Sequence, residues 1–327
     1  MSNSTDIKQW IASSVSSGYT LEQLRSTLLK VGFRHEQIEA ELAIAMPYIT
    51  AAEQLYTRLS RREKLMMSLD QQLRHIPEYL HITKTPLPAH EQFLEEYCYP
   101  NRAGLFSNAL EGCTAKGWTP RNLVDKVGAG TEVQIQYGRD AGSIYEHNTA
   151  KYRRIIAFGQ YIELVENTPP TNNFYMTNVN SEFNSSAFLS LRNELSDLDY
   201  LTPDSDEQPH HILIGPAGTQ TLAHYDNANV MLIQVYGRKL VRLVPALQVP
   251  YMYNNTHPRS SDFDLLAPNL QQYPEFANAT VIDVEIGPGD CLFIPVGWWH
   301  HITSLSTSIS ITTGNIRGCE HMKVFLP

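Results

Sequence analysis

The sequence has little cysteine and no long hydrophobic run. Its four cysteines lie far apart in 327 residues and form no CxxC pair, so neither a zinc ribbon nor a disulfide framework is indicated. We expect four reduced thiols. No apolar stretch approaches the roughly 20 residues of a membrane span, and the N-terminus lacks the charged-then-apolar order of a signal peptide. A cytoplasmic protein with no membrane partner is therefore predicted.

Positive charge is also scarce. The chain has 25 Lys and Arg against 34 Asp and Glu, a formal net charge of -9. Non-specific nucleic-acid binding depends on clustered basic residues, so this balance disfavours a nucleic-acid partner and leaves room only for a local basic pocket. With 42% apolar and 18% charged residues, the composition is typical of a folded globular protein, long enough for one large and one small domain.

Residues 1–74 show helical spacing of their apolar positions and are predicted to form a small bundle. Thr20 and Gln23 fit a capping box at the start of its second helix. A third helix is expected to end before Pro47, because proline disfavours helical geometry in the residue before it. A fourth helix should then run from 51 to about 74. Such a bundle could recognise a peptide or mediate homodimerisation.

The pattern changes in residues 75–327. Prolines interrupt the helices, and beyond His210 short β-type runs dominate, each ended by Gly, Pro or Asn. These runs are HHILIG, NVMLIQVY, KLVRLVP, TVIDVEI, CLFIP, HHITS and TSISITTG. They predict a second domain with a strand-rich barrel or sandwich. The loop-like segment 245–279 is longer than most connections and could fold over a site.

One motif suggests metal chemistry. In TLAHYD, His224 and Asp226 are two residues apart, so an extended segment places both side chains on one face. His300, in FIPVGWWHHI, could supply a third ligand from a neighbouring strand. Two histidines and one carboxylate on one face of a metal leave three positions open, as in non-haem Fe(II) oxygenases. On the HxD pair alone, a hydrogen-bonded surface pair of His224 and Asp226 is ordinarily the better interpretation.

Three longer segments resemble a known family. GPAGTQTLAHYD, QVYGRKLVRLVP and EIGPGDCLFIPVGWWHHITSLSTSISITTGN, in this order and at these separations, are similar to the JmjC, or cupin-8, hydroxylases. Within them, the likeness is to the group containing the asparaginyl hydroxylase of hypoxia-inducible factor. It is specific over 210–315 and extends to roughly 75–320. The resemblance implies a mostly β fold with some α, a double-stranded β-helix (jelly-roll, cupin) barrel preceded by the helical bundle.

The resemblance also implies a cofactor and an activity. His224, Asp226 and His300 would hold Fe(II), with His301 a neighbour and not a ligand. With 2-oxoglutarate and O2 as co-substrates, the chain would be a dioxygenase that hydroxylates a protein or peptide side chain. The alternatives are hydroxylation of a small molecule, amino acid or natural-product intermediate, demethylation of N-methyl-lysine, and a non-catalytic metal-binding cupin.

A co-substrate site is implied in the same way. Lys239, fifteen residues after the first ligand, stands where the family has a lysine that pairs with the distal carboxylate of 2-oxoglutarate. Thr221 matches a co-substrate hydroxyl position, and Tyr175 looks like the tyrosine that completes the carboxylate site. The chain departs from the family where many relatives have asparagine, because Val230 stands there and Asn229 comes one residue earlier.

Overall fold

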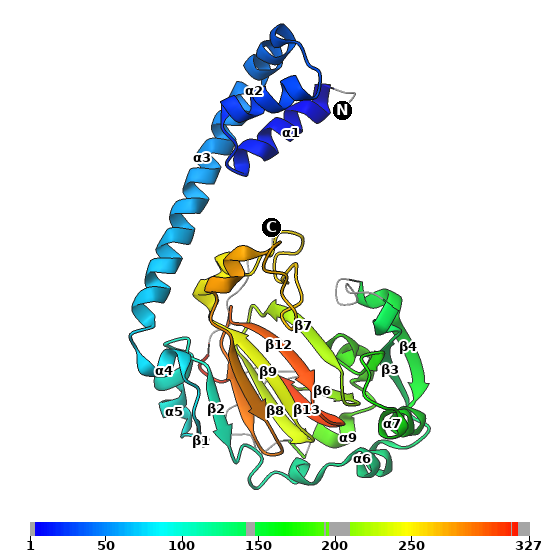
Figure 1. The fold of residues 1–327 in the computed structure, drawn as a ribbon. Helices are drawn as coiled ribbons and strands as arrows, with labels where there is room; N and C mark the ends of the chain where they lie inside the picture. Colours follow the sequence, from blue (N-terminus) through cyan, green and yellow to red (C-terminus); the bar gives the residue numbers. More distant parts are fainter. Residues whose placement is uncertain (1–3, 142–147, 193, 196–209, 315, 320–327) are drawn as a thin grey trace. The chain divides into compact units, whose positions relative to one another are not determined.

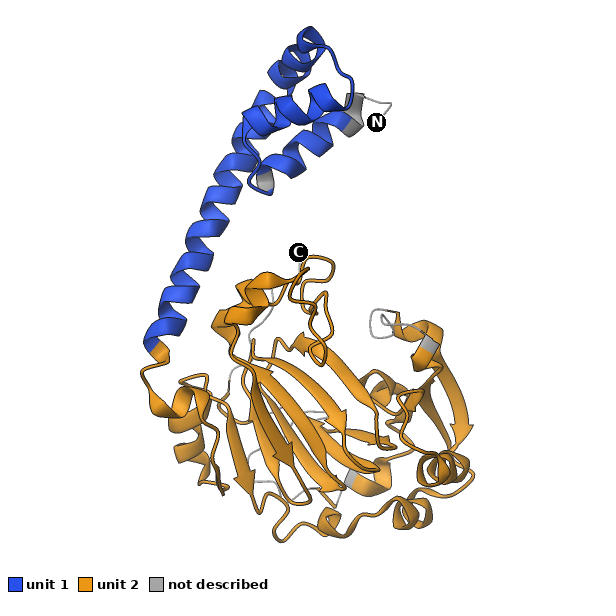
Figure 2. Cartoon of the chain, viewed as in Figure 1, with its two compact units in different colours: residues 1–72 blue, residues 73–327 orange. Residues whose placement is uncertain are grey.

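The computed structural model describes residues 4–141, 148–192, 194–195, 210–314 and 316–319 (Figure 1). Two compact units make up the chain, residues 1–72 and 73–327 (Figure 2). Of the helices in the described part, none combines the length and the apolar character that a bilayer crossing needs.

The first unit is a helical bundle of α1 (Ser4–Ser16), α2 (Leu21–Lys30) and α3 (His35–Leu73). The capping box is confirmed: the Gln23 amide donates to Thr20 Oγ1 at 3.2 Å, and the Thr20 amide donates to Gln23 Oε1 at 2.8 Å. Apolar residues from all three helices form one buried cluster. Burial of these faces stabilises helices that would be marginal alone.

The prediction that a helix ends before Pro47 is wrong. Helix α3 continues through this proline and joins the two helices that were expected on either side of it. Its buried residues keep helical spacing across the proline, at Ile38, Leu42, Ala45, Ile49 and Ala52. Their packing against α1 and α2 outweighs the hydrogen bond that proline cannot donate.

The second unit is built around two β-sheets, and the last eight strands of the chain, β6 to β13, are divided equally between them. This arrangement confirms the predicted cupin barrel. The six-stranded sheet has the order β1-β2-β11-β8-β13-β6, and the four-stranded sheet has the order β10-β9-β12-β7. One buried cluster takes side chains from both sheets, so the sheets pack face to face. The strands are β1 Lys84–Pro86, β2 Gly104–Ser107, β6 His210–Gly215, β7 Gln220–Tyr225, β8 Val230–Tyr236, β9 Lys239–Val244, β10 Ile282–Ile286, β11 Cys291–Ile294, β12 Trp299–Ser304 and β13 Ser308–Thr313.

A smaller three-stranded sheet, with the order β4-β3-β5, lies beside the barrel (Figure 1). Its strands are β3 (Glu132–Tyr137), β4 (Arg153–Ala157) and β5 (Phe174–Tyr175). A backbone bridge between Met176 and Ile214 ties the segment after β5 to β6. This bridge brings Tyr175 and Gln136, its register partner in β3, to the barrel. The helices of this unit are α4 Pro77–Leu80, α5 His90–Phe93, α6 Pro120–Val127, α7 Phe158–Asn167, α8 Ser181–Asn184 and α9 Leu189–Arg192.

The segment 245–279 covers the outer face of the four-stranded sheet. It contains the short helices η6 (Ala246–Tyr251) and η7 (Pro274–Asn278). Met252, Leu265 and Phe276 from this segment form a buried cluster with Trp299 of β12. The long connection is thus anchored by apolar packing.

The expectation of four reduced thiols is wrong for one pair. Cys98 and Cys319 are joined by a disulfide with their Cα atoms 6.2 Å apart, whereas Cys113 and Cys291 are free and buried. The paired residues are separated by 221 positions in the sequence. Only the fold brings the helix η1 (Leu94–Cys98) next to the segment that follows β13, so spacing carried no sign of this pair.

Candidate metal centre

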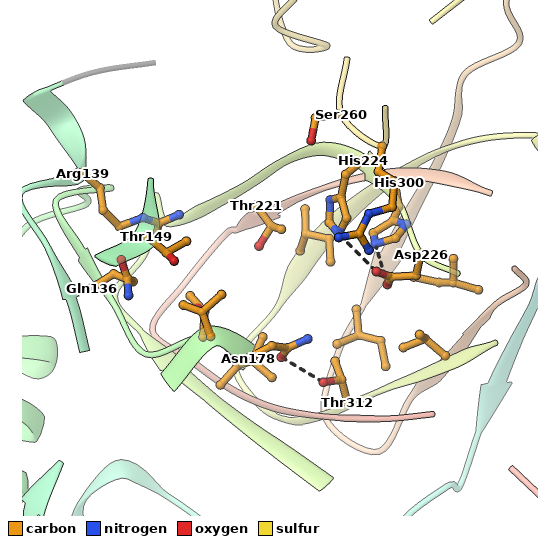
Figure 3. A pocket seen from close by; sticks show the side chains of 18 of the residues that line it. Gln136, Arg139, Thr149, Asn178, Thr221, His224, Asp226, Ser260, His300 and Thr312 are labelled. Carbon is orange, nitrogen blue, oxygen red and sulfur yellow. Dashed lines mark hydrogen bonds and ion pairs between the residues drawn. The ribbon is translucent and has the colours of Figure 1, made fainter. Parts of the chain in front are cut away.

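His224, Asp226 and His300 come together at one end of the barrel. His224 lies on β7, Asp226 directly follows that strand, and His300 lies on the paired strand β12, opposite His224. Asp226 Oδ1 is 3.9 Å from His224 Nε2, and Asp226 Oδ2 is 3.6 Å from His300 Nε2. One potential ligand atom from each residue lies within 4.8 Å of the other two. The geometry therefore suits a single metal ion held by all three side chains (Figure 3).

Both histidines are oriented as metal ligands should be. His224 Nδ1 is 2.8 Å from the Leu222 carbonyl oxygen, and His300 Nδ1 is 3.1 Å from the Trp298 carbonyl oxygen. A carbonyl oxygen only accepts, so each Nδ1 carries the proton and donates it. Each Nε2 is then left with a free lone pair toward Asp226, the arrangement that orients histidine for a metal.

Burial keeps His300 neutral. It lowers the pKa of this ring to about 4, and the neighbouring His224 acts in the same direction, against the opposing effect of the Asp226 carboxylate. A neutral imidazole is the form that binds a metal. The adjacent His301 points to the other face of β12, where burial also lowers its pKa to about 4. The structure thus places His300, and not His301, beside Asp226.

Thr221 faces the same cavity as the three potential ligands, although a regular strand would turn it away. It is three residues before His224, and residues an odd number apart in a strand point to opposite faces. A register shift changes this: Ile302 pairs with Thr221 and His300 pairs with His224. The bulge therefore adds one residue on β7, and Thr221 and His224 both line the cavity.

Lys239 and Tyr175 contact each other in the buried interior, and neither is among the residues that line the cavity beside the three potential ligands. Lys239, the first residue of β9, is fully buried, and its ammonium Nζ donates to the Tyr175 hydroxyl oxygen at 3.0 Å. Gly215 leaves room for the tyrosine ring, because a Cβ there would lie 2.6 Å from ring atom Cδ2. A buried ammonium needs an anionic or strongly polar partner. This pair is suited to receive a carboxylate.

Val230 stands where many relatives of the family have asparagine, and this substitution changes the cavity wall. The Val230 side chain lines the cavity. The Asn229 amide oxygen accepts a hydrogen bond from the Val296 amide at 2.9 Å, and the Asn229 amide nitrogen lies 3.9 Å from Cys98 Sγ. Asn229 is thus used to hold the backbone, and an apolar side chain faces the cavity in its place.

His224, Asp226 and His300 line a cavity of about 310 Å³, which is within the size range of small-molecule sites. Its wall includes polar residues for which the sequence carried no spacing signal. They come from the three-stranded sheet, from the segments around it, from β13 and from the 245–279 segment, and include Gln136, Arg139, Asn178, Thr312 and Arg259. Thr312 Oγ1 donates to Asn178 Oδ1 at 3.1 Å across this wall.

Comparison with known proteins gives the family. The model of a cupin-like domain, cupin-8, matches residues 90–313, more than half of the chain. The chain belongs to the cupin-8 family. The predicted resemblance to JmjC, or cupin-8, proteins is therefore confirmed, and the matched region contains all three potential ligands as well as Tyr175, Thr221 and Lys239.

The curated relatives of this cupin-8 protein include two lysine-specific demethylases and a tRNA-modifying protein. It is 33% identical to lysine-specific demethylase 8 of Xenopus tropicalis over 33% of this chain and 25% of the relative. It is 25% identical to lysine-specific demethylase JMJ30 of Arabidopsis thaliana over 68% of this chain and 52% of the relative. It is 26% identical to tRNA wybutosine-synthesizing protein 5 of Danio rerio over 72% of this chain and 73% of the relative. The chain thus spans a quarter to a half of the length of the two demethylases.

The cofactors of the JmjC family are Fe(II) and 2-oxoglutarate, and the residues of this cupin-8 chain fit both. Two imidazoles with free Nε2 atoms and one carboxylate are a donor set that non-haem iron accepts. The buried Lys239 ammonium with the Tyr175 hydroxyl offers charge and hydrogen bonds to a carboxylate.

Proposed function

We propose that this chain is an Fe(II)- and 2-oxoglutarate-dependent oxygenase that hydroxylates a side chain of a protein or peptide. The observation that carries the proposal is the joining of two sites in one barrel: the His224, Asp226 and His300 cluster and the buried Lys239–Tyr175 pair. Fe(II) with 2-oxoglutarate and O2, when bound, supplies the oxidising power for hydroxylation of a C–H bond.

The residues of the chain would position the metal and the co-substrate and shield the reacting atoms from water. His224, Asp226 and His300 would hold the metal, and the cavity beside them would receive the co-substrate and the substrate. Lys239 and Tyr175 would bind the distal carboxylate of the co-substrate, and the Thr221 hydroxyl, which faces the cavity, would offer it a further hydrogen bond. Leu232, Ile294 and Ile302 line the cavity with apolar side chains, which would keep water from the reacting atoms.

A polypeptide substrate is favoured over a nucleic acid by the net charge of -9. The cavity also reaches the surface, since the lining residues Asn178, Val179 and Arg259 are exposed. A side chain of a larger molecule could therefore enter it. Demethylation of N-methyl-lysine is the second candidate, because two of the relatives are named lysine-specific demethylases and both reactions begin with hydroxylation.

The two candidates differ in their products. Iron-loaded protein would be incubated with 2-oxoglutarate, O2 and two peptide sets, one unmodified and one containing methylated lysine. Succinate with a peptide that gains one oxygen atom supports the hydroxylase, whereas formaldehyde from the methylated set supports the demethylase. Turnover only with free amino acids or other small molecules would favour a small-molecule hydroxylase. No turnover by iron-loaded protein would favour a metal-binding cupin without catalysis.

A further inference from the structure

The C-terminal half of α3 has no packing partner within its own unit. Figure 1 shows this half extending beyond α1 and α2. The last residue that α3 gives to the buried cluster of the bundle is Ala52, and every residue from 53 to 69 is exposed or half-buried. In proteins most helical stability comes from packing of an apolar face. This half of the helix therefore lacks the usual source of its stability.

The exposed half carries an apolar line with the spacing of a coiled coil. Leu55, Leu59 and Leu69 lie on it and are 50%, 45% and 42% exposed. The complete line, which we call the α3 seam, is Leu55, Leu59, Arg62, Met66 and Leu69, at intervals of four, three, four and three residues. This repeat assigns its members alternately to the d and a positions of a heptad, which face the same repeat on a second helix.

The charges beside the α3 seam fit a second copy of the same helix. Arg58 precedes an a position and Glu63 follows a d position, so they occupy g and e positions on either side of the seam. In a parallel pair of helices, a g residue lies beside the e residue five positions later on the other helix. Arg58 of each chain would then lie beside Glu63 of the other chain, which gives two pairs of opposite charge.

Neither charge has an opposite charge to pair with on its own helix. The positions three and four residues from Arg58 hold no carboxylate: they are Gln54, Leu55, Arg61 and Arg62. Those around Glu63 hold no base: they are Leu59, Ser60, Met66 and Met67. Like charges at these spacings destabilise an isolated helix, so the three arginines oppose helix formation unless a carboxylate approaches from another chain.

Arg62 is the one charged member of the α3 seam. A single charged residue at a seam position lowers stability but specifies register and orientation. Arginine can keep its methylene groups against apolar neighbours while its guanidinium reaches outward. In the parallel pair the Arg62 guanidinium can reach Glu63 of the other chain. The dimer should therefore be weaker than one with an uninterrupted leucine seam.

We propose that the chain forms a homodimer through a parallel two-stranded coiled coil of the α3 seam, with Arg58 of each chain paired with Glu63 of the other. The proposal gives the predicted homodimerisation of the helical bundle a specific surface. It goes beyond the proposed function and does not depend on it, because the coiled coil needs neither metal nor co-substrate.

The test is the mass of the full chain by sedimentation velocity from about 1 to 200 µM, a range chosen for a micromolar dissociation constant. We expect the mass to rise from the 37.0 kDa of one chain toward that of two chains. Leu59→Asp should weaken the dimer by at least about 100-fold, because it buries two carboxylates in the seam. The milder Leu59→Ala should weaken it by about 10-fold or more.

A charge exchange tests the parallel register. Arg58→Glu and Glu63→Arg should each weaken the dimer by about 10- to 30-fold, because each places like charges side by side twice. The double variant restores opposite charges, and its dissociation constant should return to within about threefold of the native value. In an antiparallel pair g residues face g residues, so no restoration is expected. Arg61→Glu, an exposed position outside the seam, is the matched control and should leave the dimer unchanged.

Three results would overturn the inference. They are a monomer at every concentration, a dimer that Leu59→Asp and Leu59→Ala leave unchanged, and a charge-exchanged double variant that is as weak as the single variants. Thermal unfolding would confirm that each variant is folded, which we expect because the substituted side chains are exposed. Succinate release is measured separately, so failure of the dimer and failure of the proposed function are distinguishable.

Discussion

Replacement of Lys239 by methionine tests the co-substrate site. The substitution keeps the length of the side chain and removes its charge. Lys239 is fully buried, and its hydrogen bond in the described structure is to the neutral Tyr175 hydroxyl, at 3.0 Å. A buried ammonium is stabilised chiefly by an anion, which in the proposed function is the distal carboxylate of 2-oxoglutarate. Lys239→Met should therefore weaken co-substrate binding and not the fold.

A hydrogen bond to a charged group contributes about 1.5 to 3 kcal/mol. The KM for 2-oxoglutarate should therefore rise by roughly 10- to 150-fold, and saturating co-substrate should restore most of the succinate release. The free energy of unfolding without ligands should not fall, because this ammonium has no ion pair with a carboxylate among the described residues, and a charge buried without such a partner carries a desolvation cost that methionine removes. Lys64→Met, on an exposed position of α3, is the control for the same chemical change.

The measurement is succinate release as a function of 2-oxoglutarate concentration, with urea unfolding of the same preparations. An unchanged KM in a folded Lys239→Met protein would refute the assignment of this lysine. So would a variant that loses stability but binds 2-oxoglutarate normally once folded, because the lysine would then serve the fold alone.

Two further predictions concern the Tyr175 ring and pH. Gly215→Ala places a Cβ 2.6 Å from the Tyr175 ring, so it should displace this tyrosine and raise the KM for 2-oxoglutarate. Gly130→Ala, whose Cβ would lie in open space, should leave the KM unchanged. Equal KM values in the two variants would contradict this prediction. Burial lowers the pKa of His300 and of His301 to about 4, below the unfolded value near 6.5, so the unfolded chain binds protons first. The free energy of unfolding of metal-free protein, measured in urea, should fall as pH drops from about 6.5 toward 4, and a flat profile would count against neutral buried histidines.

Much of the barrel could be predicted from local patterns. Each short β-type run beyond His210 became a strand, because β-branched residues alternate or cluster between turn formers. The two-residue spacing of His224 and Asp226 also pointed to one site, since both residues lie on or just beyond a single strand. His300 could be offered only as a possible third ligand from a neighbouring strand until the family resemblance singled it out, because its position opposite His224 is a matter of strand pairing.

Features that depend on distant contacts could not be predicted. Thr221 faces the cavity because of a bulge, which local spacing does not encode. Helix α3 continues through Pro47 because two other helices bury its apolar face. Arg139 and Gln136 reach the cavity from the small sheet, which the Met176–Ile214 bridge after β5 ties to β6. The Cys98–Cys319 disulfide depends on the same kind of long-range placement.

The most direct test of the central claim is succinate formation from 2-oxoglutarate after Fe(II) is loaded anaerobically and O2 is admitted. Native protein, His224→Ala, His300→Ala and His301→Ala would be compared, with thermal unfolding to confirm that each is folded. The account predicts succinate from the native protein and from His301→Ala, and little from the other two variants. No succinate from native, iron-loaded protein would contradict it, as would activity that survives in His300→Ala and is lost in folded His301→Ala.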